Sequence, residues 1–228
     1  MELPGGGENP GVIFGIGHST LSAAAFMELL ASAPATALWD IRSYPTSRWP
    51  WFAGEELARR LPPAGIDYRW VKALGGRRRA PRHPAPDAAP PADPVTTSRT
   101  SRAADLALPV DSAIALFSPP VGGAPRWTAE GFENYQWHMA TPEFLAAASE
   151  LLIAGRRVDV AIMCAEALWW RCHRSMVADF VVYAGGEVIH LQPERRAHSA
   201  VIGDRFARYD PGVLAVWERH LAGLRDPG

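Results

Sequence analysis

The 228-residue sequence predicts an α/β fold, with a mainly parallel sheet of about five strands flanked by helices on both faces. Short apolar runs alternate along the chain with longer stretches whose apolar residues recur three and four positions apart, as in strands and amphipathic helices. Such alternation implies right-handed crossover connections and a parallel sheet. Ligands of open parallel sheets bind beyond the carboxyl ends of the strands, so we expect the active site there.

The individual elements follow from these patterns. Strands are expected at 12–16, 36–41, 67–74, 160–163 and 187–191. Helices are expected to begin near residues 20–22, 55, 130, 142, 170 and 210. The clearest helix start is Thr141 followed by Pro142, because threonine caps a helix and proline suits its first turn.

Composition bounds the class of protein. Residues 1–11 are expected to be a flexible lead-in, and residues 12–228 a single domain with a Pro/Arg-rich insertion at about 77–128 that lacks periodicity. The net charge of −1 gives no global basic signature, although every cation except Lys72 is an arginine. Two cysteines without a secretory leader favour a reducing cytoplasm, and no apolar run is long enough to span a bilayer. We therefore expect a cytoplasmic protein with no membrane partner.

The densest group of reactive side chains lies between the strand at 160–163 and the helix that follows it. This turn holds Cys164, Glu166, Trp169, Trp170, Arg171, Cys172, His173 and Arg174. If the helix begins near Trp170 or Arg171, Cys172 and His173 lie in its first turn. The helix dipole and neighbouring arginines would then lower the pKa of the thiol.

Polar residues also follow the other predicted strands. His18 and Ser19 follow the first strand, Asp40 and Arg42 end the second, Gly75 to Arg79 follow the third, and His190 ends the last. Because the carboxyl ends of parallel strands meet at one edge, these groups are expected to converge. The segment from Arg48 to Phe52 interleaves arginine with tryptophan, which suits stacking on bases and contact with phosphate.

These motifs, taken in order, resemble the domain-of-unknown-function family numbered 488. They are Gly17-His18-Ser19-Thr20, Asp40-Ile41-Arg42-Ser43-Tyr44-Pro45, Ala73-Leu74-Gly75-Gly76, Glu143-Phe144, Cys164-Ala165-Glu166 and Cys172-His173-Arg174. The resemblance covers about residues 12–192 and leaves the proline-rich insertion and the C-terminal tail unexplained. It implies a compact α/β fold, a cytoplasmic bacterial protein and, for some members, removal of modified bases from DNA.

The leading hypothesis is a DNA glycosylase of base-excision repair, a hydrolase that removes an oxidised or hydroxymethylated pyrimidine from DNA without a metal or other cofactor. A carboxylate would stabilise the developing positive sugar or activate water, and a histidine would protonate the leaving base. The expected catalytic residues are Asp40, Glu166, His18 and His173. The expected residues for binding DNA and the base are Ser19, Arg42, Tyr44, Arg48, Trp49, Trp51, Arg77, Arg78, Trp169, Trp170 and Arg174. A lyase step usually needs an amine, and only the lone Lys72 or the N-terminus could provide one, so we predict a monofunctional enzyme.

Other functions remain open at this point. Cys164 or Cys172 can serve a rhodanese-like or phosphatase-like thiol enzyme, although neither is followed by a tight cysteine-loop-arginine cradle. A non-catalytic metal-containing protein that binds nucleic acid is a further alternative, but the spacing of the cysteines is not that of a zinc finger or ribbon. A reader of modified DNA would bind without cleavage. Arg174 can equally be the structural ion-pair partner of Asp40 or Glu166.

Overall fold

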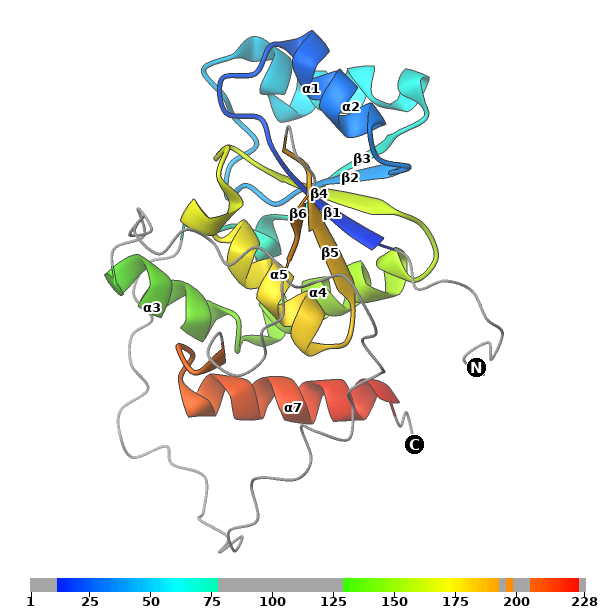
Figure 1. Cartoon of the computed structure of the whole chain (residues 1–228). Helices are drawn as coiled ribbons and strands as arrows, with labels where there is room; N and C mark the ends of the chain where they lie inside the picture. The colour runs from blue at the N-terminus through cyan, green and yellow to red at the C-terminus, as the bar shows by residue number, and fades with distance from the viewer. Residues whose placement is uncertain (1–11, 78–128, 193–195, 199–205, 226–228) are drawn as a thin grey trace, which may run out of the picture. The chain divides into compact units, whose positions relative to one another are not determined.

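The computed structural model describes residues 12–77, 129–192, 196–198 and 206–225 (Figure 1). All of these belong to one compact unit of the chain, formed by residues 1–81 and 125–228. The predicted lead-in at 1–11 and nearly all of the predicted insertion at 77–128, including Arg78, lie outside the described residues.

A six-stranded sheet with the order β3-β2-β4-β1-β5-β6 forms the centre of this unit. Its strands are β1 (Val12–Gly17), β2 (Ala37–Asp40), β3 (Asp67–Trp70), β4 (Val160–Cys164), β5 (Glu187–His190) and β6 (Arg196–Ala197). The first five run parallel, and only β6 is antiparallel to its neighbour. The predicted α/β class and the mainly parallel sheet are therefore confirmed.

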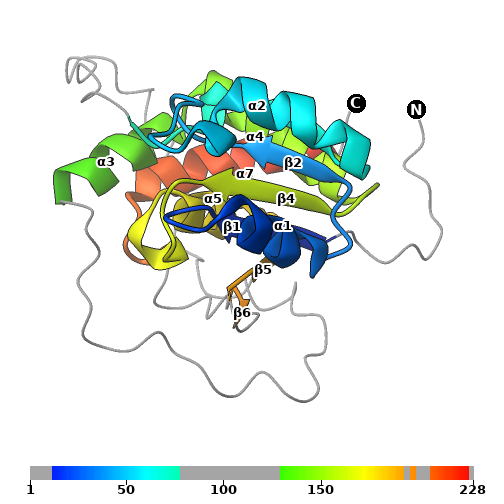
Figure 2. The same ribbon diagram turned by 90° about the horizontal axis from the view of Figure 1, so that it is seen from above.

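Helices cover both faces of the sheet, as Figures 1 and 2 show. The helices are α1 (Ala23–Ala31), α2 (Gly54–Arg60), α3 (Ala129–His138), α4 (Pro142–Gly155), α5 (Arg174–Tyr183) and α7 (Pro211–Arg225). Helices α1 and α2 pack on one face and the other four lie on the opposite side. None of the described helices is long and apolar enough to cross a membrane.

Alternation along the strands separates two cores. In β4, Ala161 and Met163 face α1 and α2, whereas Val160, Ile162 and Cys164 face the other core, because successive side chains of a strand point to opposite faces. Trp39 of β2 and Ile41, the first residue after this strand, lie on the side of Cys164. Asp40, between them, therefore points to the opposite side of the sheet.

The predicted cap at Thr141 is confirmed, and Ser22 caps the helix that was expected to begin near residues 20–22. Ser22 Oγ accepts a hydrogen bond from the Ala25 N–H at 3.1 Å, and Thr141 Oγ1 accepts one from the Phe144 N–H at 3.3 Å. Each cap satisfies an N–H that the first helical turn leaves without a partner.

Three local expectations were wrong. The third strand ends at Trp70 and not at residue 74, because its neighbour β2 ends at Asp40 and offers no further residue for pairing. A 3-10 turn over residues 72–74 follows. The final strand is β6, whose two residues are too few to show a period. Helix α5 begins at Arg174, after a 3-10 turn at Trp169–Arg171.

This late start changes the environment of Cys172 and His173. Cys172 has an extended backbone, with φ −143° and ψ 166°, and His173 occupies the N-cap position. Neither residue lies within the first turn, so the lowered thiol pKa expected there from the helix dipole needs another cause.

Candidate functional site

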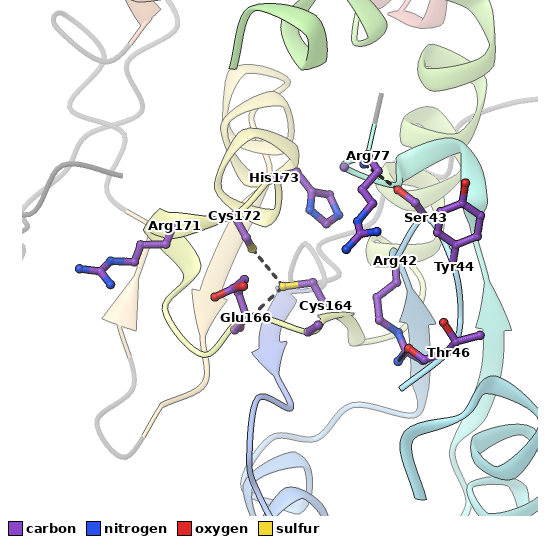
Figure 3. A pocket seen from close by; sticks show the side chains of 12 residues that line it. Arg42, Ser43, Tyr44, Thr46, Arg77, Cys164, Glu166, Arg171, Cys172 and His173 are labelled. Atoms are coloured by element: carbon purple, nitrogen blue, oxygen red, sulfur yellow. Dashed lines mark hydrogen bonds between the residues drawn. The ribbon is translucent and has the colours of Figure 1, made fainter. Parts of the chain in front are cut away.

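A cavity of about 340 Å³ opens at the carboxyl edge of the sheet (Figure 3). It is formed by the segment after β2, the end of the segment after β3, and the loop between β4 and α5. Its lining residues are Arg42, Ser43, Tyr44, Thr46, Gly76, Arg77, Cys164, Ala165, Glu166, Arg171, Cys172 and His173.

The sheet register brings these segments together. Gly17 pairs with Cys164, and Asp40 pairs with Met163, so three strands end at nearly the same level. The ladder continues one residue further, with His18 N–H donating to Cys164 O at 3.2 Å and Ile41 N–H donating to Met163 O at 2.9 Å. The polar groups that follow the strands therefore meet at one edge.

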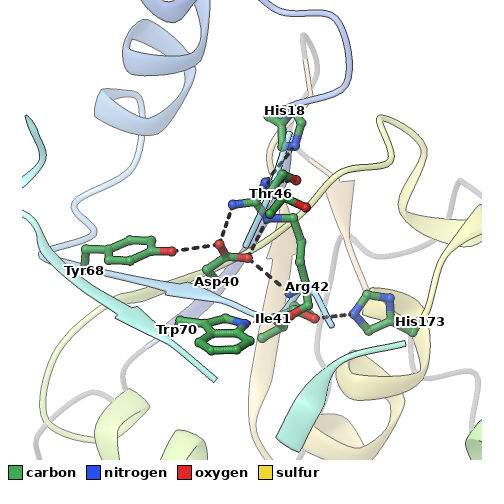
Figure 4. Close-up of polar contacts among 8 residues, drawn as sticks. All are labelled: His18, Asp40, Ile41, Arg42, Thr46, Tyr68, Trp70 and His173. Atoms are coloured by element: carbon green, nitrogen blue, oxygen red, sulfur yellow. Dashed lines mark hydrogen bonds and ion pairs between the residues drawn. The ribbon is translucent and has the colours of Figure 1, made fainter. Parts of the chain in front are cut away.

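Asp40 holds Arg42 in place from beneath the pocket (Figure 4). The carboxylate is fully buried and accepts from Arg42 Nε at 2.8 Å and Nη2 at 2.5 Å, and also from the Arg42 N–H at 3.1 Å. The Tyr68 hydroxyl donates to the same carboxylate at 2.9 Å. All sides of Asp40 are thus occupied, and Arg42, not Asp40, reaches the pocket lining.

His18 belongs to the same network and does not line the pocket. Its ring stacks on Phe52, with centroids 4.3 Å apart, and its Nε2 lies 3.4 Å from Arg42 Nη1. Its Nδ1 lies 3.2 Å from Ser19 O, a distance that suits donation to that carbonyl. Burial and the neighbouring Arg42 lower the pKa of His18 to about 4, so the ring is neutral at pH 7.

His173 lies in the pocket wall. Its Nε2 is 2.7 Å from Ile41 O, which orients the ring between the second strand and α5. Gly76 packs directly against it, and a Cβ at that position would lie 2.4 Å from Nδ1. A glycine is therefore required at residue 76 for the chain to pass the histidine.

The two cysteines lie at the base of the pocket, with Cys164 Sγ and Cys172 Sγ 3.0 Å apart (Figure 3). The Arg174 N–H points to Cys172 Sγ at 3.4 Å. Burial alone would raise the pKa of Cys164, but the hydrogen bond with Cys172 and the charge of Arg174 lower it to about 7. Burial and the neighbouring Cys164 raise the pKa of Cys172 well above its ordinary value.

Arg174 is fully buried and forms no ion pair with any carboxylate of the described chain. Its Nη2 donates to two backbone carbonyls, Glu166 O at 3.2 Å and Ala167 O at 3.1 Å. Its Nε and Nη1 have no hydrogen-bond partner among the described residues. The structural pairing of Arg174 with the Asp40 or Glu166 side chain, considered from sequence, is therefore wrong, because Arg42 occupies Asp40 and Arg174 contacts only the Glu166 backbone.

Glu166 supplies the one carboxylate among the pocket-lining residues, and it is exposed. Three arginines share that lining: Arg42, Arg77 and Arg171. The side chain of Arg171 extends away from the pocket centre, whereas Arg42 and Arg77 approach from the side opposite Glu166 (Figure 3). A single carboxylate thus faces a cationic wall.

A comparison with protein families matches residues 22–93 and 119–181 to the family described as "Domain of unknown function DUF488". The chain belongs to this family. Comparisons with curated proteins and with solved structures find no match. The family resemblance inferred from the motifs is confirmed, but the DUF488 description names no reaction.

The pocket of this DUF488 protein lies wholly within the matched ranges. Of the predicted site residues, the structure gathers there Arg42, Tyr44, Arg77, Cys164, Glu166, Cys172 and His173. Ser43, Thr46 and Arg171 also line it, although they were not among the predicted binding residues. Tyr68, which supports Arg42, was also missed, because only the sheet register reveals it.

The remaining predicted residues of the DUF488 pocket lie elsewhere. Trp169 is buried and stacks on His190 with ring centroids 4.2 Å apart, and Trp170 packs edge-on against Trp169. Arg48 lies over the ring of Trp49, and Arg60 lies over that of Trp51. Among the described residues, no group of three or more His, Cys, Asp or Glu could hold a metal ion.

Proposed function

We propose that this protein is a DNA glycosylase that takes a modified pyrimidine, flipped out of the duplex, into the pocket at the sheet edge. The observation that carries the proposal is the placement of one exposed carboxylate, Glu166, opposite the arginines of the same cavity. Hydrolysis of an N-glycosidic bond needs a carboxylate near the sugar and cations near the phosphates and the departing base.

Glu166 is the carboxylate best placed for the reaction. Asp40 is excluded from this role by geometry, because both of its oxygens are taken by Arg42 and Tyr68. Glu166 would stabilise the positive charge that develops on the sugar, or activate the attacking water. Asp40 is assigned to positioning Arg42.

The cationic side of the pocket suits the rest of the substrate. Arg77 is exposed and reaches into the cavity, where it would offset negative charge on the leaving base. Its backbone N–H donates to Ser43 Oγ at 2.7 Å, which ties the segment after β3 to the segment after β2. Tyr44 is 61% exposed beside the cavity and offers a ring for stacking.

The test uses duplex oligonucleotides that carry a panel of oxidised and hydroxymethylated pyrimidines, followed by alkali to reveal abasic sites. The wild-type protein is expected to cleave at one modified base. Glu166→Gln should lower the single-turnover rate by roughly 10²–10⁴-fold, the usual share of a catalytic acid or base. Retained binding of the same duplex would show that the loss is chemical.

Glu187→Gln is the matched control, because Glu187 is an exposed carboxylate at the amino end of β5, on the opposite edge of the sheet. It should excise at the wild-type rate. Binding of a modified duplex without any excision would replace the glycosylase by a reader of modified DNA. Excision by Glu166→Gln at the wild-type rate would remove Glu166 from the mechanism.

A cysteine-dependent enzyme is the second candidate, favoured by the presence of Cys164 in the pocket lining. The two functions predict opposite orders for the loss of turnover in Cys164→Ser and Glu166→Gln. A thiol enzyme would lose all turnover in Cys164→Ser, whereas a glycosylase would lose far more in Glu166→Gln than in Cys164→Ser.

The proposed enzyme is monofunctional. Lys72, the sole lysine of the chain, stands at the start of the 3-10 turn after β3 and does not line the pocket. Borohydride reduction during turnover should therefore trap no covalent DNA adduct, since no lysine amine is placed to form a Schiff base.

A further inference from the structure

Arg174, which is buried and lies close in sequence to the pocket-lining Cys172, carries a charge without a carboxylate partner in the described chain. A fully buried guanidinium normally has a carboxylate partner, because an isolated charge is costly to remove from water. Arg174 has none in the described chain and uses only two backbone carbonyls. An anion in contact with this group would therefore be strongly favoured.

The groups placed to supply that anion are the two thiols. Cys172 Sγ accepts from the backbone N–H of Arg174, and Cys164 Sγ lies 3.0 Å from Cys172 Sγ. The guanidinium itself lies near Cys164, because a Cβ at Gly17, the sheet partner of Cys164, would lie 2.9 Å from Arg174 Nη1. Both sulfurs line the cavity, so they are reachable from solvent through it despite their burial (Figure 3). Two adjacent thiols, one of them ionised by a cation, are the requirements of thiol–disulfide exchange.

We propose that Cys164 and Cys172 form a redox-active dithiol that exchanges with low-molecular-weight disulfides, with Arg174 as the counterion of the Cys164 thiolate. The site is distinct from the proposed base excision, because it depends on the two sulfurs and Arg174 and not on Glu166. A failure of either proposal leaves the other standing.

Two successive exchanges balance the reaction. The Cys164 thiolate attacks one sulfur of the small disulfide, which forms a mixed disulfide at Cys164 and releases one thiolate. Cys172 then attacks the Cys164 sulfur, gives its proton to solvent, and releases the second thiolate. Overall the protein dithiol is oxidised by two electrons to a disulfide, and the small disulfide is reduced to two thiols.

The order of attack follows from the surroundings of each sulfur. The Cys164 sulfur lies beside Cys172 Sγ and near the Arg174 guanidinium, which agrees with its lowered pKa. Cys172 keeps its proton and is the resolving thiol, which agrees with its raised pKa. Cys172 has an extended backbone outside any helix, which leaves its sulfur free to approach Cys164.

The experiment incubates the reduced full-length protein with bis(2-hydroxyethyl) disulfide at pH 8 and reads the product by intact mass after acid quenching. The wild type should lose the mass of two hydrogens and accumulate little mixed disulfide. Cys172→Ser should stop at a stable mixed disulfide on Cys164. Cys164→Ser should react at least about tenfold more slowly than the wild type, since its remaining thiol has the raised pKa.

Arg174→Lys and Arg174→Gln test the counterion. The glutamine variant should lower the rate of alkylation by iodoacetamide at pH 7 by about fivefold if the thiol pKa rises by one unit and by about tenfold for each further unit, and the lysine variant by less. If Arg174→Gln fails to fold, the pH dependence of alkylation in the wild type and Arg174→Lys decides the point. The proposal is overturned if the folded wild type keeps two free thiols, or if Cys172→Ser accumulates no mixed disulfide.

Discussion

Two buried arginines lie near the pocket, Arg42 in its lining and Arg174 next to the strand pair of Gly17 and Cys164, and their surroundings differ. Arg42 is held by both oxygens of Asp40, the carbonyl of Thr46 and the ring of His18. Arg174 is more deeply buried, yet the described hydrogen bonds of its guanidinium are to two backbone carbonyls only. Arg42 is thus paired with a carboxylate, whereas Arg174 has no carboxylate partner among the described residues.

The comparison separates structural from reactive charge. A buried ion pair with saturated hydrogen bonds fixes geometry and adds little chemistry of its own. A buried cation without a carboxylate instead biases the ionisation of its neighbours. The Asp40–Arg42 pair therefore fixes the geometry of the pocket wall, and Arg174 influences the ionisation of the two cysteines.

The largest expected effect comes from replacing each arginine by methionine. Arg42→Met leaves Asp40 buried without its cation, and should lower the free energy of unfolding by about 3–5 kcal/mol. Arg174→Met leaves no carboxylate unpaired. It should lower the free energy of unfolding by no more than about 1–3 kcal/mol, because only hydrogen bonds to two carbonyls are lost. Urea unfolding at pH 6, followed by tryptophan fluorescence, compares the two directly.

The double variant Asp40→Leu with Arg42→Met is the control for this comparison. Removing both charges together should recover most of the stability lost by Arg42→Met, because no unpaired group remains. Equal losses in the two single methionine variants would show that Arg174 is as firmly paired as Arg42, which would contradict the distinction drawn between them.

Of the two arginine environments, that of Arg42 contains a histidine whose lowered pKa makes stability depend on acid. The pKa of His18 falls to about 4 in the folded protein, first through burial and then through Arg42, from 6.5 in the unfolded chain. The unfolded chain therefore takes up the proton first, and stability falls as the pH drops from about 6.5 to about 4, by roughly 2–3 kcal/mol. His18→Gln should remove this part of the pH dependence.

Other carboxylates titrate in the same acid range, so the useful measurement is the difference between the stability curves of wild type and His18→Gln. The two curves should diverge below pH 6.5. Parallel curves down to pH 4 would mean that His18 is protonated in the folded protein as readily as in the unfolded chain, and that Arg42 does not lower its pKa.

Much of the fold could be predicted from local patterns. The caps at Ser22 and Thr141 and the parallel strands are local features, and the structure bears them out. The partner of Asp40 could also have been predicted, because Arg42 is two residues away in the sequence and a buried carboxylate usually pairs with a cation. The prediction instead weighed Asp40 as a catalytic group.

The environment of Arg174 could not be predicted in the same way. Its burial depends on the late start of α5, which places Cys172 before the helix and turns the arginine under the loop after β4. The proximity of the two cysteines depends on the same turn, and a separation of eight residues does not reveal it. Such tertiary arrangements are not encoded in hydrophobic periodicity.

The smallest expected effect lies on the Arg174 side and in alkali. The pKa of Cys164 is about 7 in the folded protein, against 9 for an ordinary thiol, so the folded state releases its proton first. Stability should therefore rise as the pH increases from about 7 to about 9, by about 1–2 kcal/mol, with the raised pKa of Cys172 reversing the trend above that range.

Urea unfolding in the presence of a phosphine reductant, at half-unit steps of pH, measures this rise. Cys164→Ser should show no rise, and Arg174→Met should show a smaller one, because the thiolate then lacks its cation. A rise of equal size in all three proteins would place its origin outside the dithiol. A rise that needs both Cys164 and Arg174 would show that the second buried arginine does find its anion, in a sulfur instead of a carboxylate.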